Sequence, residues 1–137
     1  MKYEYLEHTA DMKFKSYGKT LEDAFQNAVL AVSNFLSREK PVKSDLIEKT
    51  TLEGEDNESL LYELLDHTIF LLDSKSFLVA SVSIKISKKE NKLIAEVIFK
   101  GDDASKYDIN QIKAATYAEM KIKKTSEGYE VQAVMDV

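Results

Sequence analysis

The sequence contains no cysteine and no tryptophan, and only one proline and four glycines in 137 residues. The lack of cysteine excludes disulfides and thiolate metal sites and is typical of a protein of the reducing cytosol. No apolar run approaches the ~18–20 residues that a membrane-spanning helix needs. The N-terminal residues also lack the apolar core of a secretory signal. We therefore expect a cytoplasmic protein without a membrane anchor.

Basic residues are fewer than acidic ones, with 19 Lys and Arg against 24 Asp and Glu. The formal net charge is −5, the sequence pI is about 5.1, and Arg38 is the single arginine. Proteins that grip a nucleic-acid backbone carry a dense basic surface, and arginine supplies the bidentate contacts to phosphate. We expect no strong direct binding to nucleic acid. Any role in nucleic-acid metabolism would pass through another protein.

The length predicts one domain over residues 1–137, because compact domains typically have about 100–150 residues. Two segments have helical periodicity. In 21–36, apolar residues recur every three or four positions, and Thr20 precedes them as an N-cap. The second segment runs from about Asn57 to Asp73, and Asp56 is its predicted cap.

Other segments alternate between apolar and polar residues, which is typical of strands with one buried face. One hairpin is predicted from 81–87 and 93–99, and another joins 116–124 to 129–136. Shorter strands are predicted at 3–7, 13–17 and 46–53. Together these patterns predict an α+β fold, a two-layer sandwich of a mixed or mainly antiparallel β-sheet with two helices. Only 101–110 has no useful periodicity, and a long polar loop of this kind is often functional or mobile.

The common catalytic signatures are absent. The sequence has neither of the glycine-rich phosphate-binding patterns nor the nucleophile-elbow pattern. His8 and His67 are not at metal-ligand spacing, and His67 is expected on the solvent-facing rim of its helix. Histidine or cysteine chemistry therefore has little support in the sequence.

Carboxylates are the remaining candidates, because hard divalent cations prefer several oxygen ligands. Asp11 lies between two predicted strands, where a rigid scaffold can hold a side chain. Asp136 and Val137 end the last predicted strand, so the terminal carboxylate is itself a candidate ligand. Spacing alone gives no compact cation-binding loop, and a single aspartate is more often a turn former or a solvated charge.

Five motifs, taken in chain order, resemble the archease family along nearly the whole chain. They are Tyr5-Leu6-Glu7-His8-Thr9-Ala10-Asp11, the helix entry Gly18–Phe25, Leu60-Leu61-Tyr62-Glu63-Leu64-Leu65, Lys113-Ala114-Ala115-Thr116-Tyr117, and Asp136-Val137. The chain departs from the family pattern at Ala118, where a histidine is usual, and in having no tryptophan in its last hairpin.

The resemblance implies an accessory protein rather than an enzyme. Archeases assist the tRNA-splicing RNA ligase by promoting its guanylylation and multiple turnover, and they can broaden its nucleotide use. Carried over, the resemblance implies a divalent cation, Ca²⁺ first and Mg²⁺ or Mn²⁺ as alternatives, bound by Asp11, Asp136 and the terminal carboxylate of Val137. His8, Lys113 and Tyr117 become candidate contacts with the ligase.

Two other functions stay open at this point. The acidic residues could serve a metal-dependent phosphohydrolase or nuclease, although two-metal chemistry needs several carboxylates around ions ~3.5–4 Å apart. The helices or the acidic loop could instead bind client proteins, as in a chaperone-like interaction module.

Overall fold

The computed structural model describes residues 1–7 and 10–137. In this part of the chain, the helices are α1 (Leu21–Leu36) and α2 (Asn57–Lys75), with one turn of 3-10 helix at Ala104–Lys106. The strands are β1 (Tyr3–Leu6), β2 (Met12–Gly18), β3 (Leu46–Gly54), β4 (Phe77–Lys89), β5 (Lys92–Asp103), β6 (Ala114–Ala115), β7 (Lys121–Thr125) and β8 (Gly128–Asp136).

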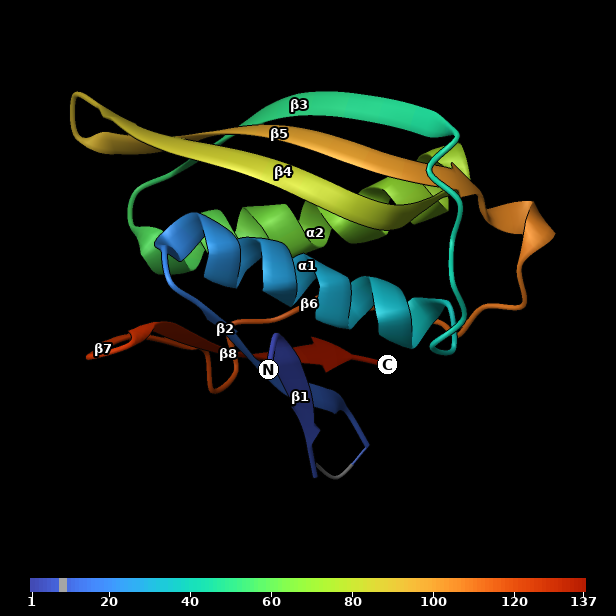
Figure 1. Cartoon of the computed structure of the whole chain (residues 1–137), viewed down its shortest axis with the longest axis horizontal. Helices are drawn as coiled ribbons and strands as arrows, with labels where there is room; N and C mark the ends of the chain where they lie inside the picture. The colour runs from blue at the N-terminus through green and yellow to red at the C-terminus, as the bar shows by residue number, and fades with distance from the viewer. Residues whose placement is uncertain (8–9) are drawn as a thin grey trace.

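The strands form two antiparallel sheets with the helices between them (Figure 1). The first sheet has the order β1-β2-β8-β6, and β7 also pairs with β8. The second has the order β3-β5-β4. The predicted α+β class, with two helices and antiparallel strands, is confirmed. The layering differs from the two layers expected, because each helix is apolar on more than one side and needs cover from both sheets.

The predicted helix starts are confirmed by their caps. The Thr20 hydroxyl accepts a hydrogen bond from the Asp23 amide at 3.1 Å. At α2, Asp56 and Ser59 form a reciprocal capping box, with the Ser59 amide 2.8 Å from the Asp56 carboxylate. Neither helix in the described part of the chain is long and apolar enough to cross a membrane.

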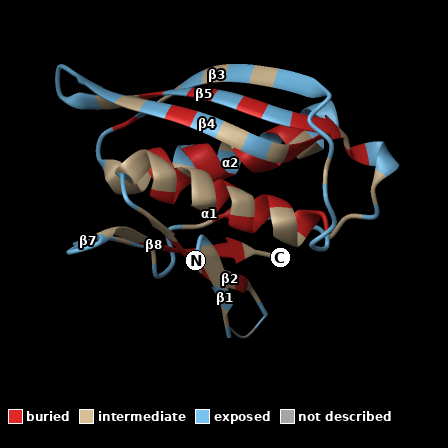
Figure 2. Cartoon of the chain, viewed as in Figure 1, coloured by how far each residue is buried: buried red, intermediate tan, exposed pale blue. Residues whose placement is uncertain are grey.

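The hydrophobic core lies on the inner faces of both sheets, around the two helices (Figure 2). Its largest fully buried side chains include Phe14 of β2, Phe25 of α1 and Phe99 of β5. Gly18 marks the exit from β2, where a Cβ atom would lie 2.2 Å from the Ala24 amide nitrogen. Glycine is therefore required where the chain turns back against the first turn of α1.

The second predicted hairpin is only partly right. β7 begins at Lys121, so residues 116–120 are not in a strand. Instead they cross the outer face of β8, where the Gln132 side-chain amide donates to the Glu119 carbonyl at 2.8 Å. This cover buries Val134 and Gln132, which the strand alternation would otherwise expose. A tertiary contact of this kind leaves no periodic signal in the sequence.

The polar segment 101–110 is anchored rather than loose. Asp102 is buried and accepts hydrogen bonds from the Tyr107 hydroxyl at 2.7 Å and the Asp103 amide at 2.8 Å. The Tyr107 hydroxyl also accepts one from the Lys43 amide, and Asn110 donates to the Phe35 carbonyl near the end of α1. The segment therefore ties the end of β5 to the chain between α1 and β3.

The hydrogen bonds to Asp102, chiefly the one from the Tyr107 hydroxyl, hold the pKa of this carboxyl below its ordinary value of 3.8. A carboxyl with a lowered pKa in the folded state stabilises the fold above its ordinary pKa and loses that effect as pH falls through the folded value. We expect the melting temperature of the wild type to fall more steeply below about pH 4 than that of Asp102→Asn, measured by calorimetry. Parallel curves would show that Asp102 makes no pH-dependent contribution.

Candidate functional site

Asp11 and Asp136 come together at one end of the β2–β8 pair. The register ends with Met12 opposite Met135, and Asp11 and Asp136 are the residues next to this last pair. Side chains that are directly opposite in antiparallel strands point to the same face of the sheet. The two predicted metal ligands, which are 125 positions apart in sequence by their numbering, therefore lie at the same end of this strand pair.

The strand alternation decides which face these carboxylates occupy. Met12 and Met135 are buried against the helices, so Asp136, the next residue of β8, lies on the outer face of the sheet. Asp11 comes one residue before β2, and both aspartates are half-buried. Val137 then turns inward and packs its side chain against the core. The Asp136 carbonyl accepts a hydrogen bond from the Lys113 amide at 2.7 Å. The end of β8 is thus held from both sides.

A further acidic residue lies beside this pair and was not anticipated from the sequence. Glu119 pairs with Lys13 at 3.0 Å, and Lys13 shares the outer face with Asp11 two residues away. Glu119 reaches this position because the 116–120 segment folds over β8, with a left-handed backbone at Glu119 itself (φ 53°). A polar loop residue carries no sequence signal for such a placement.

The donor set suits a hard cation but is small. In the part of the chain that the structure describes, no three His, Asp or Glu side chains converge closely enough to hold a metal ion. Asp11 and Asp136 supply two side-chain carboxylates, so the set needs the terminal carboxylate of Val137 as its third anionic oxygen donor. Packing of the Val137 side chain on the core restricts where that carboxylate can lie.

Two of the candidate partner-contact residues, Lys113 and Tyr117, lie in the described part of the chain. Lys113 is exposed and adjoins Asp136 through its amide. Tyr117 is 54% exposed and stacks on Tyr62 of α2, with ring centroids 4.4 Å apart and planes 6° from parallel. His8 lies outside the described residues. The sequence did not single out Tyr62 as the partner of Tyr117.

The environment of Tyr117 keeps its phenol protonated. Partial burial raises the pKa of Tyr117, and the carboxylates of Glu63 and Asp56 raise it further. The hydroxyl is therefore available as a hydrogen-bond donor at neutral pH and is a poor general base.

His67 belongs to a different part of the molecule. Its ring stacks on Phe99 at 5.6 Å and contacts Phe70 at 5.3 Å, beneath the β3-β5-β4 sheet. Burial lowers the pKa of His67 and favours the neutral imidazole. The expectation of a solvent-facing rim position is only partly right, because the ring is half-buried in an aromatic contact.

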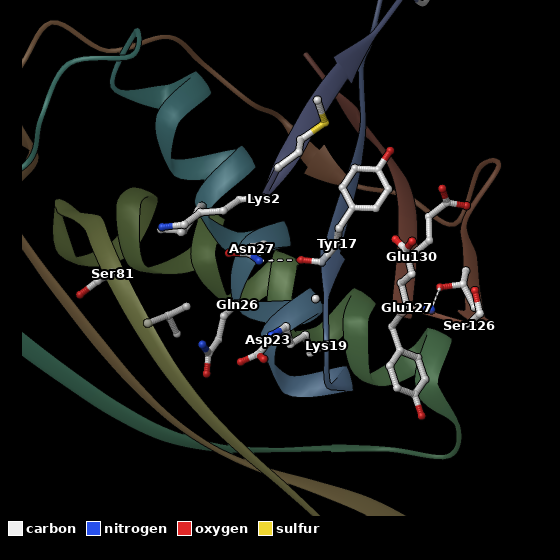
Figure 3. A pocket seen from close by; sticks show the side chains of 16 residues that line it. Lys2, Tyr17, Lys19, Asp23, Gln26, Asn27, Ser81, Ser126, Glu127 and Glu130 are labelled. Carbon is white, nitrogen blue, oxygen red and sulfur yellow. Dashed lines mark hydrogen bonds between the residues drawn. The ribbon is translucent and has the colours of Figure 1, made fainter.

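A large hollow lies away from the two aspartates (Figure 3). Its volume is about 990 Å³. The lining residues include Tyr17, Gly18, Tyr129 and Glu130, which lie where β2 ends and β8 begins, at the other end of this strand pair from the two aspartates. Pocket size therefore does not point to the predicted cation site.

Polar side chains in this hollow already have structural partners. The Asn27 side-chain amide donates to the Tyr17 carbonyl at 2.6 Å, as Figure 3 shows, and the Gln26 side-chain oxygen accepts from the Ile84 amide at 3.0 Å. These contacts fix α1 between the two sheets. The hollow therefore lies at the junction of α1 with both sheets.

Comparison with known proteins decides the family. The model of the archease protein family matches residues 3–137. The chain belongs to the archease family. Archease of Methanosarcina barkeri is 34% identical, with 98% of this chain and 95% of that protein aligned. Archease of Pyrococcus furiosus is 33% identical, with 98% of each chain aligned.

Solved structures agree with this assignment. The solution structure of protein 1598 from Methanobacterium thermoautotrophicum matches with a TM-score of 0.87 at 27% identity, covering 98% of both chains. The crystal structure of an archease from Thermotoga maritima, described as a possible chaperone, matches with a TM-score of 0.59 at 22% identity, covering 96% of this chain and 94% of that one. The second likeness shows the shared fold.

The stack of Tyr117 on Tyr62 makes a measurable prediction about stability. We expect a double-mutant cycle of Tyr117→Ala and Tyr62→Ala to give a coupling of about 0.5–1.5 kcal/mol in urea unfolding, because stacked rings contribute beyond the area they bury. A control cycle that combines Tyr117→Ala with Tyr17→Ala should be additive, since Tyr17 lies on β2 and bonds Glu4. Additivity in both cycles would mean that the stack contributes nothing to stability.

Proposed function

We propose that this archease is an accessory protein of the tRNA-splicing RNA ligase that promotes guanylylation and multiple turnover and broadens nucleotide use. Family membership over residues 3–137 supports this proposal. The observation that supports it is the β2–β8 register, which brings the residues next to Asp11 and Asp136, Met12 and Met135, opposite each other. A pair of carboxylates on an outer face is accessible to a partner protein.

The same pair is proposed to bind one divalent cation with the terminal carboxylate of Val137. All donors in this set are hard oxygens, which suit Ca²⁺ and also Mg²⁺ or Mn²⁺. A bound cation would supply positive charge for phosphate oxygens at a site with few protein ligands. The chain's own part is to hold three carboxylates in place through the β2–β8 register and the packing of Val137.

Lys113 and Tyr117 are proposed to contact the ligase from either side of this acidic end. Lys113 is exposed next to Asp136, and Tyr117 presents a protonated phenol held by its stack on Tyr62. His8 remains a proposed contact on family grounds. In this proposal the protein itself performs no chemical step and acts by positioning groups at the ligase.

A ligation assay tests the function. With ligase limiting, we expect several rounds of RNA joining per ligase in the presence of the wild-type protein and about one round in its absence. Asp11→Asn and Asp136→Asn should lose most of this stimulation, whereas Asp45→Asn, at an exposed aspartate before β3, should keep it. Full stimulation by both site variants would refute the role of the pair. Hydrolysis of phosphate esters by the isolated protein with Mg²⁺ would favour the phosphohydrolase alternative.

The terminal carboxylate has a test of its own. One glycine added after Val137 moves the terminal charge by about one residue, roughly 3.3–3.6 Å along the chain. We expect this extension to weaken Ca²⁺ binding at least tenfold by calorimetry, while extra residues before Met1 leave the affinity unchanged. If both tagged proteins bound Ca²⁺ equally, the terminus would not be a ligand.

A further inference from the structure

The two outer edges of the β3-β5-β4 sheet are built differently. At the β4 edge, α1 supplies acceptors to the strand: Gln26 accepts from the Ile84 amide at 3.0 Å, and Glu22 accepts from the Ile86 amide at 3.4 Å. The pairing of β4 also shifts register between Val79 and Ser81, which is a bulge. Covering side chains and bulges are devices that stop a strand edge from pairing with another chain.

The β3 edge has neither device. β3 pairs with β5 over nine residues, from Leu46 to Gly54, in one unbroken register and ends the strand order of its sheet. In the described part of the chain, no backbone hydrogen bond joins this edge to another segment. β3 runs along the far side of its sheet, away from α1, as Figure 1 shows.

The register shows which groups face outward. The Ile84 amide points to α1, so the Ile84–Val97 pair is a non-hydrogen-bonded one, and Val97 bonds to β3 at Thr50. The residues on either side of Thr50 therefore turn their N–H and C=O groups to the open edge. These edge residues are Ile47, Lys49, Thr51 and Glu53.

The helix α2 packs against β3 and carries a row of acidic residues on its exposed side. The helix runs antiparallel to β3, because Gly54 lies against Leu60 at its start and Glu48 bonds Lys75 at 2.6 Å at its end. Between these two contacts, the exposed side of α2 presents carboxylates and one aromatic ring that is 45% exposed. This row, the acidic stripe, consists of Glu63, Asp66, Phe70 and Asp73.

The acidic side chains of α2 decide which kind of strand could pair with the open edge of β3. A second copy of this chain, paired about a twofold axis, would bring its own acidic stripe against this one, and like charges repel. A strand with basic side chains on its inward face would instead meet Glu63 and Asp66, and its spacing of ~6.8 Å between same-face residues is close to the ~5–6 Å between successive turns of a helix. Phe70 offers an apolar contact in the same row.

We propose that the open edge of β3 accepts an extended, lysine- or arginine-bearing segment of a partner protein as a fourth strand, with its basic side chains over Glu63 and Asp66. Main-chain hydrogen bonds to the edge residues would give affinity, and the acidic stripe would give selectivity. This surface lies in the other sheet from Asp11 and Asp136, so it stands whether or not the partner is the ligase.

A peptide titration tests the proposed main-chain hydrogen bonds to the edge of β3. The probe is an eight-residue peptide of alternating lysine and valine, followed by amide chemical shifts of the protein. Binding should shift the amides of Ile47, Lys49, Thr51 and Glu53. Thr51→Pro removes one outward N–H, a change that edge strands tolerate, and should weaken binding at least tenfold, whereas Thr51→Val should not. If Thr51→Pro does not fold, a peptide methylated on alternate backbone nitrogens tests the wild type, and it should not bind.

Charge variants test the selectivity. Glu63→Gln and Asp66→Asn should each weaken the lysine peptide severalfold, and Glu127→Gln, at an exposed turn residue far from β3, should have no effect. A glutamate–valine peptide should not bind. Equal binding of both peptides, unchanged binding to Thr51→Pro or to both charge variants, or concentration-dependent dimers of the protein paired through β3, would each overturn the proposal.

Discussion

The antiparallel pairing of β2 with β8 is the constraint on which the rest of this structure depends. It joins the first and last parts of the chain in one sheet, with Met12 opposite Met135 and Phe14 opposite Ala133 on the face that covers the helices. The same register brings Asp11 and Asp136 to one end of this strand pair. A slip of one residue would exchange buried and exposed faces along the whole pair, so core and acidic pair are fixed together.

The helices act as a shared middle layer. α1 and α2 pack against both sheets, and side chains of α1 also accept hydrogen bonds from the edge of β4. This arrangement leaves the outer face of the β3-β5-β4 sheet exposed, whereas residues 116–120 cover part of the outer face of β8 (Figure 2). The molecule therefore offers two separate surfaces, the acidic end of β2 and β8 and the open edge of β3 along α2, and neither coincides with the hollow lined by Tyr17 and Tyr129.

Local signals in the sequence were sufficient for most elements. Thr20 and Asp56 marked both helix starts, because capping depends only on residues three positions away. The alternation around Ile84 and Val97 predicted the β4–β5 hairpin, although β4 begins at Phe77 and β5 continues to Asp103. The 116–120 segment was predicted as strand, and its true role, covering Val134 and Gln132, depends on contacts that sequence patterns do not encode.

The sequence by itself determined the fold class, the helix boundaries within two residues and, through its motifs, the family. It also singled out Asp11 and Asp136 by their places at strand ends, but their pairing rested mostly on resemblance to the family. Tertiary structure alone decided that the helices have a sheet on each side, that Tyr62 supports Tyr117, that Glu119 pairs with Lys13, and that β3 keeps an open edge. Caps and alternation arise from neighbours along the chain, whereas these features arise from strand order and from segments that meet only after folding.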